Sequence, residues 1–268
     1  MRRVLKGVFY TIFTFTTTFA NVGYAENYSN FSQLEKVVRD GAVINKKITR
    51  GEALKFLDES INSLNGLIAS KCRNAEQCKS AAKNAKQFFG IQHFYWPVEG
   101  YGRRDAGENG YNDRGYDWFD GNFHKAHPAY DIFVNDKNRD CIDDKTNGPI
   151  YVIALTDAIV ASINDTWHPF GKEKEIRGGN YIYLYTPVPS TSLVEGLFFY
   201  YAHLGEIIVK EGEIVKAGQR IATLCRTGKN AIKKRSPTHL HFSILRYVKG
   251  KGLQAIDWLR HPFKWIEK

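Results

Sequence analysis

The sequence predicts a mainly β protein, with an antiparallel β-sheet or sandwich core and an N-terminal helical annex. From about residue 129 onward, short apolar segments alternate with turn residues such as Asn147-Gly148 and Gly178-Gly179-Asn180, which is the pattern of strands joined by turns. No helical stripe interrupts these segments before the last residues, and this disfavours a fold of alternating helices and strands. Helical periodicity is confined to the stretch before about residue 90.

Length and composition are compatible with this architecture. The chain has 268 residues, of which 43% are apolar. It is therefore long enough for a large core, and its composition is that of a globular protein rather than a disordered one. We expect three parts: a signal peptide over 1–25, a helical N-terminal region over 26–92 and a β-rich domain over 93–268.

The first 25 residues have the pattern of an export signal. Basic residues in Met1–Lys6 precede an uncharged apolar run over Val8–Ala20, and Gly23-Tyr24-Ala25 places small residues where a signal peptidase cuts. The apolar run is shorter than the roughly 20 residues that a membrane helix needs. We therefore expect cleavage after Ala25, no stable membrane span in the mature chain, and a periplasmic or secreted, cell-wall-associated protein.

The charge distribution favours a polyanionic environment over nucleic acid. The formal net charge is +10, and without Arg2, Arg3 and Lys6 there remain 35 basic and 28 acidic residues, a net charge of +7. A basic exported protein is suited to anionic cell-wall polymers. The basic residues are scattered and not interleaved with aromatic ones, so the sequence does not indicate a nucleic-acid partner.

The four cysteines, Cys72, Cys78, Cys141 and Cys225, fit an oxidising compartment. Their even number permits two disulfides in three pairings. Cys72 with Cys78 could close a small loop, which would leave Cys141 with Cys225; buried free thiols are the alternative. There is no Cys-x-x-Cys pair, so a zinc site built from cysteines is not expected.

The N-terminal region contains a clear helix start. Thr49-Arg50-Gly51-Glu52 is a capping box, and an apolar stripe with spacings of three and four follows it. The stripe residues are Leu54, Leu57, Ile61, Leu64 and Ile68. A second helix is expected from about Asn74 to Phe89. Neither helix carries visible chemistry, so we expect this annex to pack on the main domain or to meet a partner.

The region after the annex predicts a loop followed by strands. A Gly-, Asn- and aromatic-rich stretch from about Phe94 to Phe123 predicts a long loop, and such loops on a β scaffold commonly line a binding groove. The predicted strands after it are Ala129–Val134, Ile150–Leu155, Ala158–Ile163, Tyr181–Tyr185, Leu197–Tyr201, Ile207–Val209, Arg220–Leu224 and Leu240–Leu245. Gly100-Tyr101-Gly102 is not followed by the helix that a nucleotide-binding site needs.

The candidate site residues lie on or beside three of these strands. His239 and His241 are two apart within an apolar strand, so both point to one face. His127 and Asp131 are four apart and would also share a face on an extended segment, and His203 follows another strand. Each motif alone could be a polar group on a solvated surface. Together they would supply imidazole and carboxylate ligands for zinc, with a fourth position open to water as in catalytic sites.

The other four histidines are not expected to be catalytic. His93 lies in an aromatic run and His124 in the predicted loop, while His168 and His261 each precede a proline. Of these, His124 is the nearest in sequence to the candidate site.

Taken in order, these motifs resemble the lysostaphin/LytM-like zinc metallopeptidases, which are endopeptidases that cleave peptidoglycan. The similarity covers about residues 95–248. Its pieces are His127 to Asp131, Tyr201 to Leu204, Val209 to Ile221, Thr227-Gly228 and His239 to Phe242. Two positions differ: Pro128-Ala129-Tyr130 stands where the family often has glycine, and Cys225-Arg226 replaces a glycine before the Thr-Gly turn. Neither change removes a ligand, and the second suggests a disulfide that rigidifies a groove loop.

The resemblance implies a β core of the duplicated hybrid motif type and one zinc ion (Zn²⁺) bound by His127, Asp131 and His241. It also implies that a zinc-bound water is the nucleophile and that His239 is the general base or proton shuttle. His203 would orient the water or stabilise the tetrahedral intermediate. The implied substrates are peptide bonds in peptidoglycan cross-links or stem peptides.

Other functions remain open on the sequence. A module of the same fold could bind the cell wall or activate an amidase without cleaving anything, although such relatives typically lack one or more ligands. An exported metalloprotease of ordinary proteins would have the same site. Residues 26–90 could also cover the groove as a latent form. The bond cleaved, the oligomeric state and the disulfide pairing are not specified by the sequence.

Overall fold

The computed structural model describes residues 30–72, 95–107, 110–123, 125–187 and 194–260. The expected signal peptide over 1–25 and the expected helix from Asn74 to Phe89 lie outside these ranges. Among the described residues, no helix is both long enough and apolar enough to cross a membrane.

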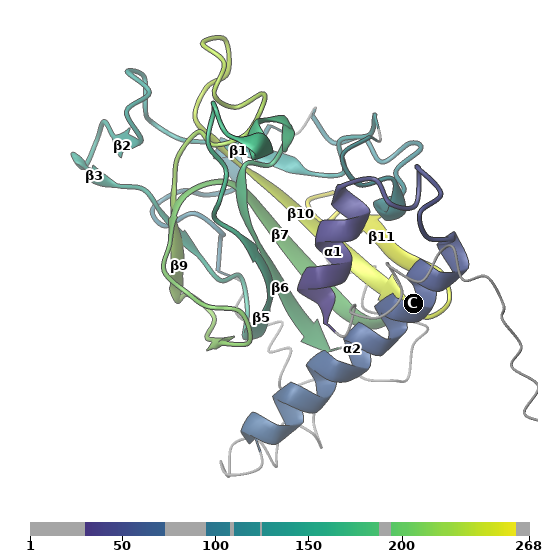
Figure 1. Cartoon of the computed structure of the whole chain (residues 1–268). Coiled ribbons are helices and arrows are strands. Elements are labelled where there is room, and N and C mark those ends of the chain that lie inside the picture. Colours follow the sequence, from purple (N-terminus) through teal and green to yellow (C-terminus); the bar gives the residue numbers. More distant parts are fainter. Residues whose placement is uncertain (1–29, 73–94, 108–109, 124, 188–193, 261–268) are drawn as a thin grey trace, which may run out of the picture.

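Within the described residues, the centre of the fold is an antiparallel sheet of nine strands, and its longer strands form the fan of arrows in Figure 1. The strands of the chain are β1 (Tyr130–Phe133), β2 (Ile142–Asp143), β3 (Gly148–Pro149), β4 (Tyr151–Ile153), β5 (Ala158–Asn164), β6 (Asn180–Pro187), β7 (Val194–Ile207), β8 (Ile214–Val215), β9 (Arg220–Leu224), β10 (His239–Val248) and β11 (Gly252–Ile256). The spatial order is β1-β10-β7-β6-β5-β8; β11 also pairs with β10, and β9 links β4 to the end of β7. β2 and β3 form a separate hairpin. The predicted mainly β, antiparallel fold is confirmed.

The strand prediction was wrong at the edges of the sheet. β7 runs on through Ile207, so the expected separate strand over Ile207–Val209 does not exist. β8, β11 and the β2–β3 hairpin were not predicted. These strands are two to five residues long. They are strands because a neighbour supplies their hydrogen-bond partners, which a local pattern does not reveal.

The two faces of the sheet bury two different cores. Alternate residues of a strand point to opposite faces. Leu240 and Phe242 of β10 therefore join one core, which also contains residues of β4 and β9, while Leu245 and Tyr247 join the other. His241 is separated from Leu245 by an even number of positions along β10, so its side chain lies on the same face of the sheet as Leu245 and Tyr247, called the second face below.

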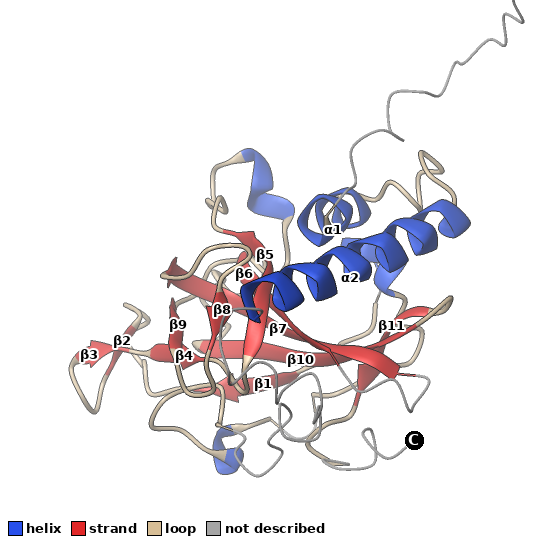
Figure 2. Ribbon diagram, turned by 90° about the horizontal axis from the view of Figure 1, so that it is seen from below, coloured by secondary structure: helices blue, strands red, loops and turns tan. Residues whose placement is uncertain are grey.

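Two helices, α1 (Phe31–Arg39) and α2 (Arg50–Cys72), cover the second face and lie above the strands in Figure 2. The predicted capping box is present at the start of α2. Thr49 N donates to Glu52 Oε2 at 2.7 Å, and Glu52 N donates to Thr49 Oγ1 at 3.2 Å. Both helices precede the sheet in the chain, as predicted for an N-terminal annex.

Helix α1 packs as part of this core and supports the segment that leads to the site. Its residues Phe31 and Val38 are each 1% exposed. The 3-10 helix η2 (Trp118–Phe123) crosses α1 so closely that a Cβ at Gly121 would collide with the carbonyl oxygen of Val38. Only glycine fits there, since its φ of 55° is also left-handed. The chain that approaches His127 is therefore held against α1. Two further 3-10 helices are η1 (Arg103–Asp105) and η3 (Lys172–Glu175).

Candidate functional site

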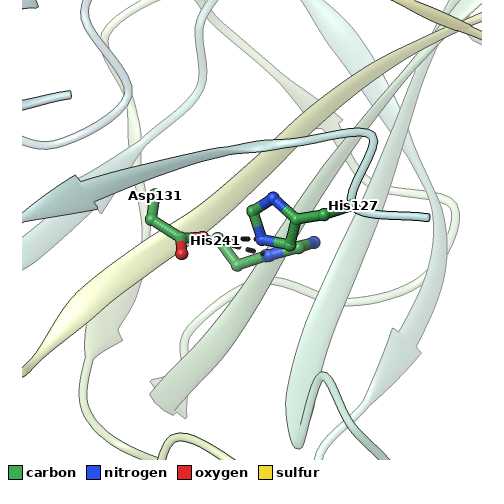
Figure 3. Close-up of side chains that lie close together, drawn as sticks. All are labelled: His127, Asp131 and His241. Carbon is green, nitrogen blue, oxygen red and sulfur yellow. Dashed lines mark hydrogen bonds and ion pairs between the residues drawn. The ribbon is translucent and has the colours of Figure 1, made fainter. Parts of the chain in front are cut away.

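Three of the predicted site residues meet on the helix-covered face of the sheet, as Figure 3 shows. His127 Nε2 lies 3.3 Å and His241 Nδ1 lies 3.2 Å from Asp131 Oδ1. One ligand atom from each of the three lies within 4.8 Å of the others, and the part of the chain that the structure describes contains no second group of this kind. Ligand atoms that each sit about 2.0–2.2 Å from one zinc ion are separated by roughly 3–4 Å. The two separations from Asp131 Oδ1 therefore suit a single ion.

The sheet positions Asp131 and His241, and a loop contact positions His127. β1 pairs with β10 so that Asp131 is directly opposite His241. Just before β1, His127 N donates to Asn112 O at 2.7 Å, and His127 Nδ1 lies 2.8 Å from Gly110 O. Because a carbonyl oxygen only accepts, Nδ1 carries the proton of the neutral ring and Nε2 keeps its lone pair, whereas the protonated ring also donates from Nε2 to Asp131. The predicted loop before the first strand thus fixes the tautomer of a candidate ligand.

Asp131 is ionised in this arrangement. Burial alone would raise the pKa of its carboxyl group, but hydrogen bonds from His127 and His241 and the charges of His241 and His239 together outweigh burial and hold that pKa well below its usual range. Burial is the largest single influence on His127 and lowers its pKa, but the hydrogen bond and the charge of Asp131, together with backbone hydrogen bonds, outweigh burial in sum, so the net pKa lies above the ordinary 6.5. For His241 burial dominates and the pKa is lowered. An anionic oxygen with two imidazoles is a donor set that zinc accepts.

His239 and His203 lie beside this cluster. Their ring centroids are 4.8 Å apart, and His239 Nε2 is 3.7 Å from Asp131 Oδ2. Each ring has its Nδ1 at 2.8 Å from a backbone carbonyl oxygen, that of Pro237 for His239 and that of Thr227 for His203. Nδ1 is therefore the donor in both rings, and Nε2 is the nitrogen available for proton transfer.

His203 is held in an uncommon backbone conformation. Its φ is 66°, in the left-handed region that costs a non-glycine residue about 1–2 kcal/mol. Its N–H donates to Gly178 O at 2.8 Å, and its carbonyl accepts from Cys225 N at 3.1 Å. Burial, followed by the charges of His239 and His241, lowers the pKa of His203 well below 6.5. The ring is consequently neutral at neutral pH.

The cluster opens into a cavity of about 710 Å³. All five predicted site residues line it, and so do Glu35, Val38 and Arg39 near the end of α1. The Arg39 guanidinium donates to the Tyr181 hydroxyl, which donates to Glu35 Oε2 at 2.6 Å. The annex therefore forms one wall of the cavity, a role that no motif in that part of the sequence indicated.

Basic side chains outnumber acidic ones around the cavity. The basic lining residues are Arg39, Lys125, Arg177 and Arg235. The acidic ones are Asp131, in the candidate metal cluster, and Glu35. Burial raises the pKa of Glu35 to about 7, although the charge of Arg39 opposes this shift. Near neutral pH the cavity is therefore positive and suited to a negatively charged ligand.

The remaining four histidines differ from the four in the site. His168 is exposed and does not line the cavity. His93, His124 and His261 lie outside the described residues. The expectation that His168 is not catalytic agrees with its position, while the other three stay predictions.

Cys141 and Cys225 are joined by a disulfide with their Cα atoms 4.8 Å apart. This is one of the pairings that the sequence left open. Cys72 is the last residue of α2, and Cys78 lies outside the described residues, so a bond between those two stays a prediction.

Sequence reasoning missed the residues whose hydrogen bonds position the two accessory histidines, His203 and His239. Thr227 accepts the ring proton of His203 through its carbonyl, and the buried Arg226 binds three carbonyl oxygens of the loop before His239. The signal that could have found them was the departure from the family pattern at Cys225-Arg226. That departure pointed to a disulfide but not to the hydrogen bonds around it.

Residues 142–255 match the family described as peptidase family M23. The matched range contains His203, His239 and His241, whereas His127 and Asp131 precede it. A comparison with curated proteins finds no match. The family match thus includes three of the five candidate site residues, and the structure places the other two, His127 and Asp131, beside them.

Solved structures similar to this chain include three bacterial proteins. A zinc containing peptidase from Vibrio cholerae is 23% identical, with 61% of this chain and 39% of that chain covered and a TM-score of 0.36. Lysostaphin, the antimicrobial peptidase from Staphylococcus simulans, is 23% identical, with 63% and 50% covered and a TM-score of 0.35. A lytM protein from Ruminococcus gnavus is 16% identical, with 87% and 86% covered and a TM-score of 0.40. The chain spans half or less of the first two proteins.

Proposed function

We propose that this chain, whose residues 142–255 match peptidase family M23, is an exported zinc endopeptidase of the lysostaphin/LytM-like kind that acts on peptidoglycan. It would hydrolyse peptide bonds in cross-links or stem peptides. The observation that carries the proposal is the group of His127, Asp131 and His241 with two further imidazoles, those of His203 and His239, beside it. Three metal ligands, a group that can transfer protons and a group that can orient the attacking water suit metal-assisted peptide hydrolysis.

The residues present fit one zinc ion. His127 Nε2, His241 Nδ1 and a carboxylate oxygen of Asp131 would hold it, and the ionised Asp131 would offset part of its charge. A zinc ion bound there supplies a Lewis acid and a water that is nucleophilic at neutral pH. The hydrogen bond from His127 Nδ1 to Gly110 O keeps the ligand ring in the required tautomer.

The two accessory histidines, His203 and His239, would have different roles. His239 Nε2 would take the proton of the attacking water and pass it to the leaving amine. His203 has its proton on Nδ1, where Thr227 O accepts it, so its Nε2 can only accept a hydrogen bond while the ring is neutral. A nitrogen that accepts a hydrogen bond from the water can orient this nucleophile. It cannot donate a hydrogen bond to a negatively charged intermediate, which was the second role considered for His203.

The charge of the cavity supports a carboxylate-bearing substrate. Four basic side chains line the cavity, and the carboxyl group of Glu35 has a raised pKa of about 7. Peptidoglycan stem peptides carry free carboxylates, whereas a bridge made only of glycine carries none between its ends. We therefore expect faster cleavage of carboxylate-bearing stem peptides or cross-links than of oligoglycine.

Two other functions remain alternatives. A wall-binding or amidase-activating module would not need three ligands and two accessory histidines in one place, so the complete site favours an enzyme. An exported metalloprotease of ordinary proteins would use the same site, and only the substrate separates it from our proposal.

The test is metal content together with release of peptidoglycan fragments. The protein without residues 1–25 would be analysed for zinc and then incubated with purified peptidoglycan or with casein, with and without a chelator. We expect about one zinc per chain and chelator-sensitive release of peptides from peptidoglycan but not from casein. Fragment masses would identify the bond. Cleavage of casein alone would favour the general protease, and bound zinc without any cleavage would contradict the proposed activity.

Export is part of the proposal and has its own test. The basic, apolar and small-residue segments over residues 1–25 support it, and the disulfide suits an oxidising compartment. We expect N-terminal sequencing of the exported protein to begin at Glu26. Retention of the full chain in the cytoplasm would contradict export.

A further inference from the structure

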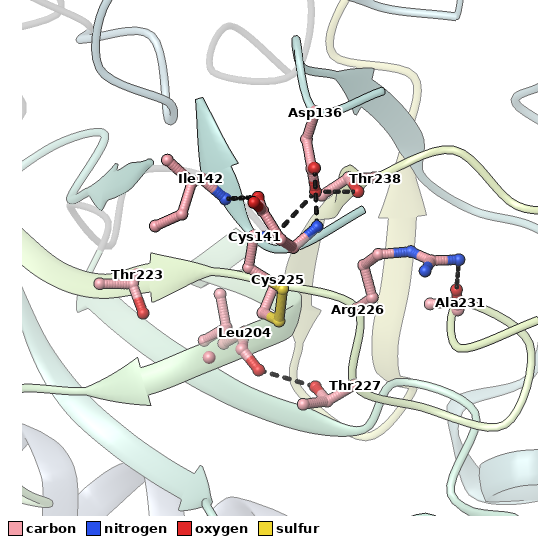
Figure 4. The surroundings of a disulfide bond; sticks show 12 residues. Asp136, Cys141, Ile142, Leu204, Thr223, Cys225, Arg226, Thr227, Ala231 and Thr238 are labelled. Carbon is pink, nitrogen blue, oxygen red and sulfur yellow. Dashed lines mark hydrogen bonds between the residues drawn. A yellow bond between two sulfur atoms is a disulfide. The ribbon is translucent and has the colours of Figure 1, made fainter. Parts of the chain in front are cut away.

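A group of residues behind the accessory histidines connects the two loops that hold them. This support cluster consists of Asp136, Cys141, Cys225 and Arg226, and Figure 4 shows it around the disulfide. The disulfide links the loop that follows β1 to the residue just after β9. Asp136 is 5% and Arg226 is 8% exposed, so two charged side chains are buried here without touching the candidate metal ligands. Buried charges are retained only where they are hydrogen-bonded or paired. The hydrogen-bond partners of Asp136 and Arg226 therefore show which segments these side chains hold in place.

One side of the disulfide holds His203. Cys225 N donates to His203 O at 3.1 Å, and two residues later Thr227 O accepts from His203 Nδ1 at 2.8 Å. The Thr227 hydroxyl donates to Leu204 O at 2.7 Å and accepts from Asn180 N at 2.9 Å. The segment that begins at Cys225 therefore fixes both the backbone and the ring of a residue that has a strained, positive φ.

The other side of the disulfide holds the residue before His239. Cys141 N donates to Asp136 Oδ2 at 3.1 Å, and the same oxygen accepts from Thr238 Oγ1 at 2.6 Å. Thr238 is 1% exposed, and its carbonyl accepts from Val134 N at 3.2 Å. The start of β10 is thus tied to the loop that carries Cys141.

Arg226 completes the link between the two sides. Its Nη2 donates to the carbonyl oxygens of three residues in the loop that leads to His239. These are Ala231 at 3.0 Å, Lys233 at 2.9 Å and Ser236 at 3.0 Å. The next carbonyl, that of Pro237, accepts from His239 Nδ1 at 2.8 Å. The residue that follows Cys225 therefore shapes the loop that orients the ring of His239.

We propose that the Cys141–Cys225 disulfide is a positioning element for the rings of His203 and His239. The roles of these two rings rest on the proposed function, but their dependence on the disulfide does not. The bond fixes Cys225 relative to Asp136, so the carbonyls of Thr227 and Pro237 stay aimed at the two Nδ1 atoms. A displacement of about 1 Å at a catalytic group can cost roughly 100-fold in rate.

The candidate metal ligands do not depend on this cluster. Asp131 and His241 are held by the pairing of β1 with β10, and His127 is held by Asn112 and Gly110. Opening the disulfide should therefore disturb the two accessory rings and leave the ligand set in place. His127 can therefore serve as an internal control. Its Nδ1 also lies 2.8 Å from a backbone carbonyl oxygen, but that contact does not involve the support cluster.

The first experiment measures ring N–H exchange by nuclear magnetic resonance in the isotope-labelled Cys72→Ser/Cys78→Ser variant. In this variant Cys141 and Cys225 form the single reducible bond. A phosphine reduces it: the phosphine takes the oxygen of one water and becomes a phosphine oxide, and the two thiols take the two hydrogens. We expect exchange of the Nδ1 protons of His203 and His239 to accelerate at least about tenfold, with that of His127 unchanged. Equal exchange before and after reduction, or equal acceleration of all three protons, would overturn the proposal.

The second measurement separates positioning from general stability. On reduction we expect kcat on peptidoglycan fragments to fall about 10–100-fold with KM and zinc content unchanged, and reoxidation to restore it. Thr238→Val, which keeps the disulfide but removes the hydroxyl that donates to Asp136, should lower kcat in the same way, while Thr238→Ser should not. Loss of zinc or unchanged kcat in the reduced enzyme would contradict the positioning role. If the oxidised protein cleaves nothing, the proposed function fails, whereas the exchange experiment still decides the positioning role.

Discussion

Asp131 and His241 lie directly opposite each other across β1 and β10, with His241 Nδ1 3.2 Å from Asp131 Oδ1. The neighbouring pair in the same register, Tyr130 and Phe242, is fully buried in the core on the other face. A slip of one residue would exchange the two faces and bury the candidate ligands in that core. The hydrophobic core and the site therefore depend on one and the same strand register.

Replacement of His127 by alanine should remove the zinc. The ring contributes one of three ligand atoms. Loss of a residue that only hydrogen-bonds to a metal ligand lowers metal affinity roughly 10–100-fold. Loss of a ligand itself should lower the affinity for zinc further. Zinc content after dialysis, measured beside the unmodified protein, checks this. Full zinc occupancy in His127→Ala would mean that the ion binds elsewhere.

Replacement of His239 by alanine should spare the zinc but slow the reaction. His239 lies beside Asp131 without belonging to the three-residue group, so one zinc per chain should remain, while kcat should fall by about 10²–10⁴-fold. The matched control is His168→Ala, because His168 is exposed and does not line the cavity. An active His239→Ala enzyme would remove this residue from the mechanism.

Glu35 should make the stability of the protein depend on pH. Burial raises its pKa from 4.5 to about 7 in the folded state. The folded state therefore binds the proton more tightly than the unfolded chain does. The resulting stabilisation is fully present below pH 4.5 and is lost as the pH rises through about 7. Relative to Glu35→Gln, the free energy of unfolding of the unmodified protein should fall by up to about 3 kcal/mol between pH 4.5 and pH 8. Urea denaturation at both pH values measures the difference, and a pH-independent difference would refute it.

Helix α1 should be needed for the fold rather than act as a removable cover. Leu34 is 0% exposed within the core that α1 shares with the sheet, so Leu34→Ala should lower the free energy of unfolding by about 2–5 kcal/mol. The matched control, Lys36→Ala on the exposed side of α1, should change it little. Denaturation of both variants checks this.

The same packing bears on the idea of a latent form. Because α1 also supports the approach to His127 through its contact with Gly121, deletion of residues 26–40 should lower activity and stability together. Higher activity of the stable truncated protein would instead support a covering role for the annex.

Local patterns in the sequence were enough to predict the main strands and the start of α2, and the resemblance of the ordered motifs to a known family singled out the five candidate site residues. Strand alternation and turn residues are properties of a few neighbouring positions, and a capping box such as Thr49 to Glu52 is a contact between residues three apart. The order of the motifs was also readable without a fold. Consequently the central strands and the candidate ligands were predicted, while the short edge strands, which depend on a partner, were missed.

The tertiary structure alone decided what surrounds those five residues. Arg39 reaches the cavity because α1 packs over the sheet, and it contacts Tyr181, which is 142 positions away. Cys225 lies behind His203 because the end of β7 pairs with β9. Such contacts arise from burial of apolar surface over the whole chain and from strand register, neither of which is a local property. The sequence by itself thus determined the candidate chemistry and the fold class, and long-range packing decided the shape, charge and support of the cavity in which that chemistry would occur.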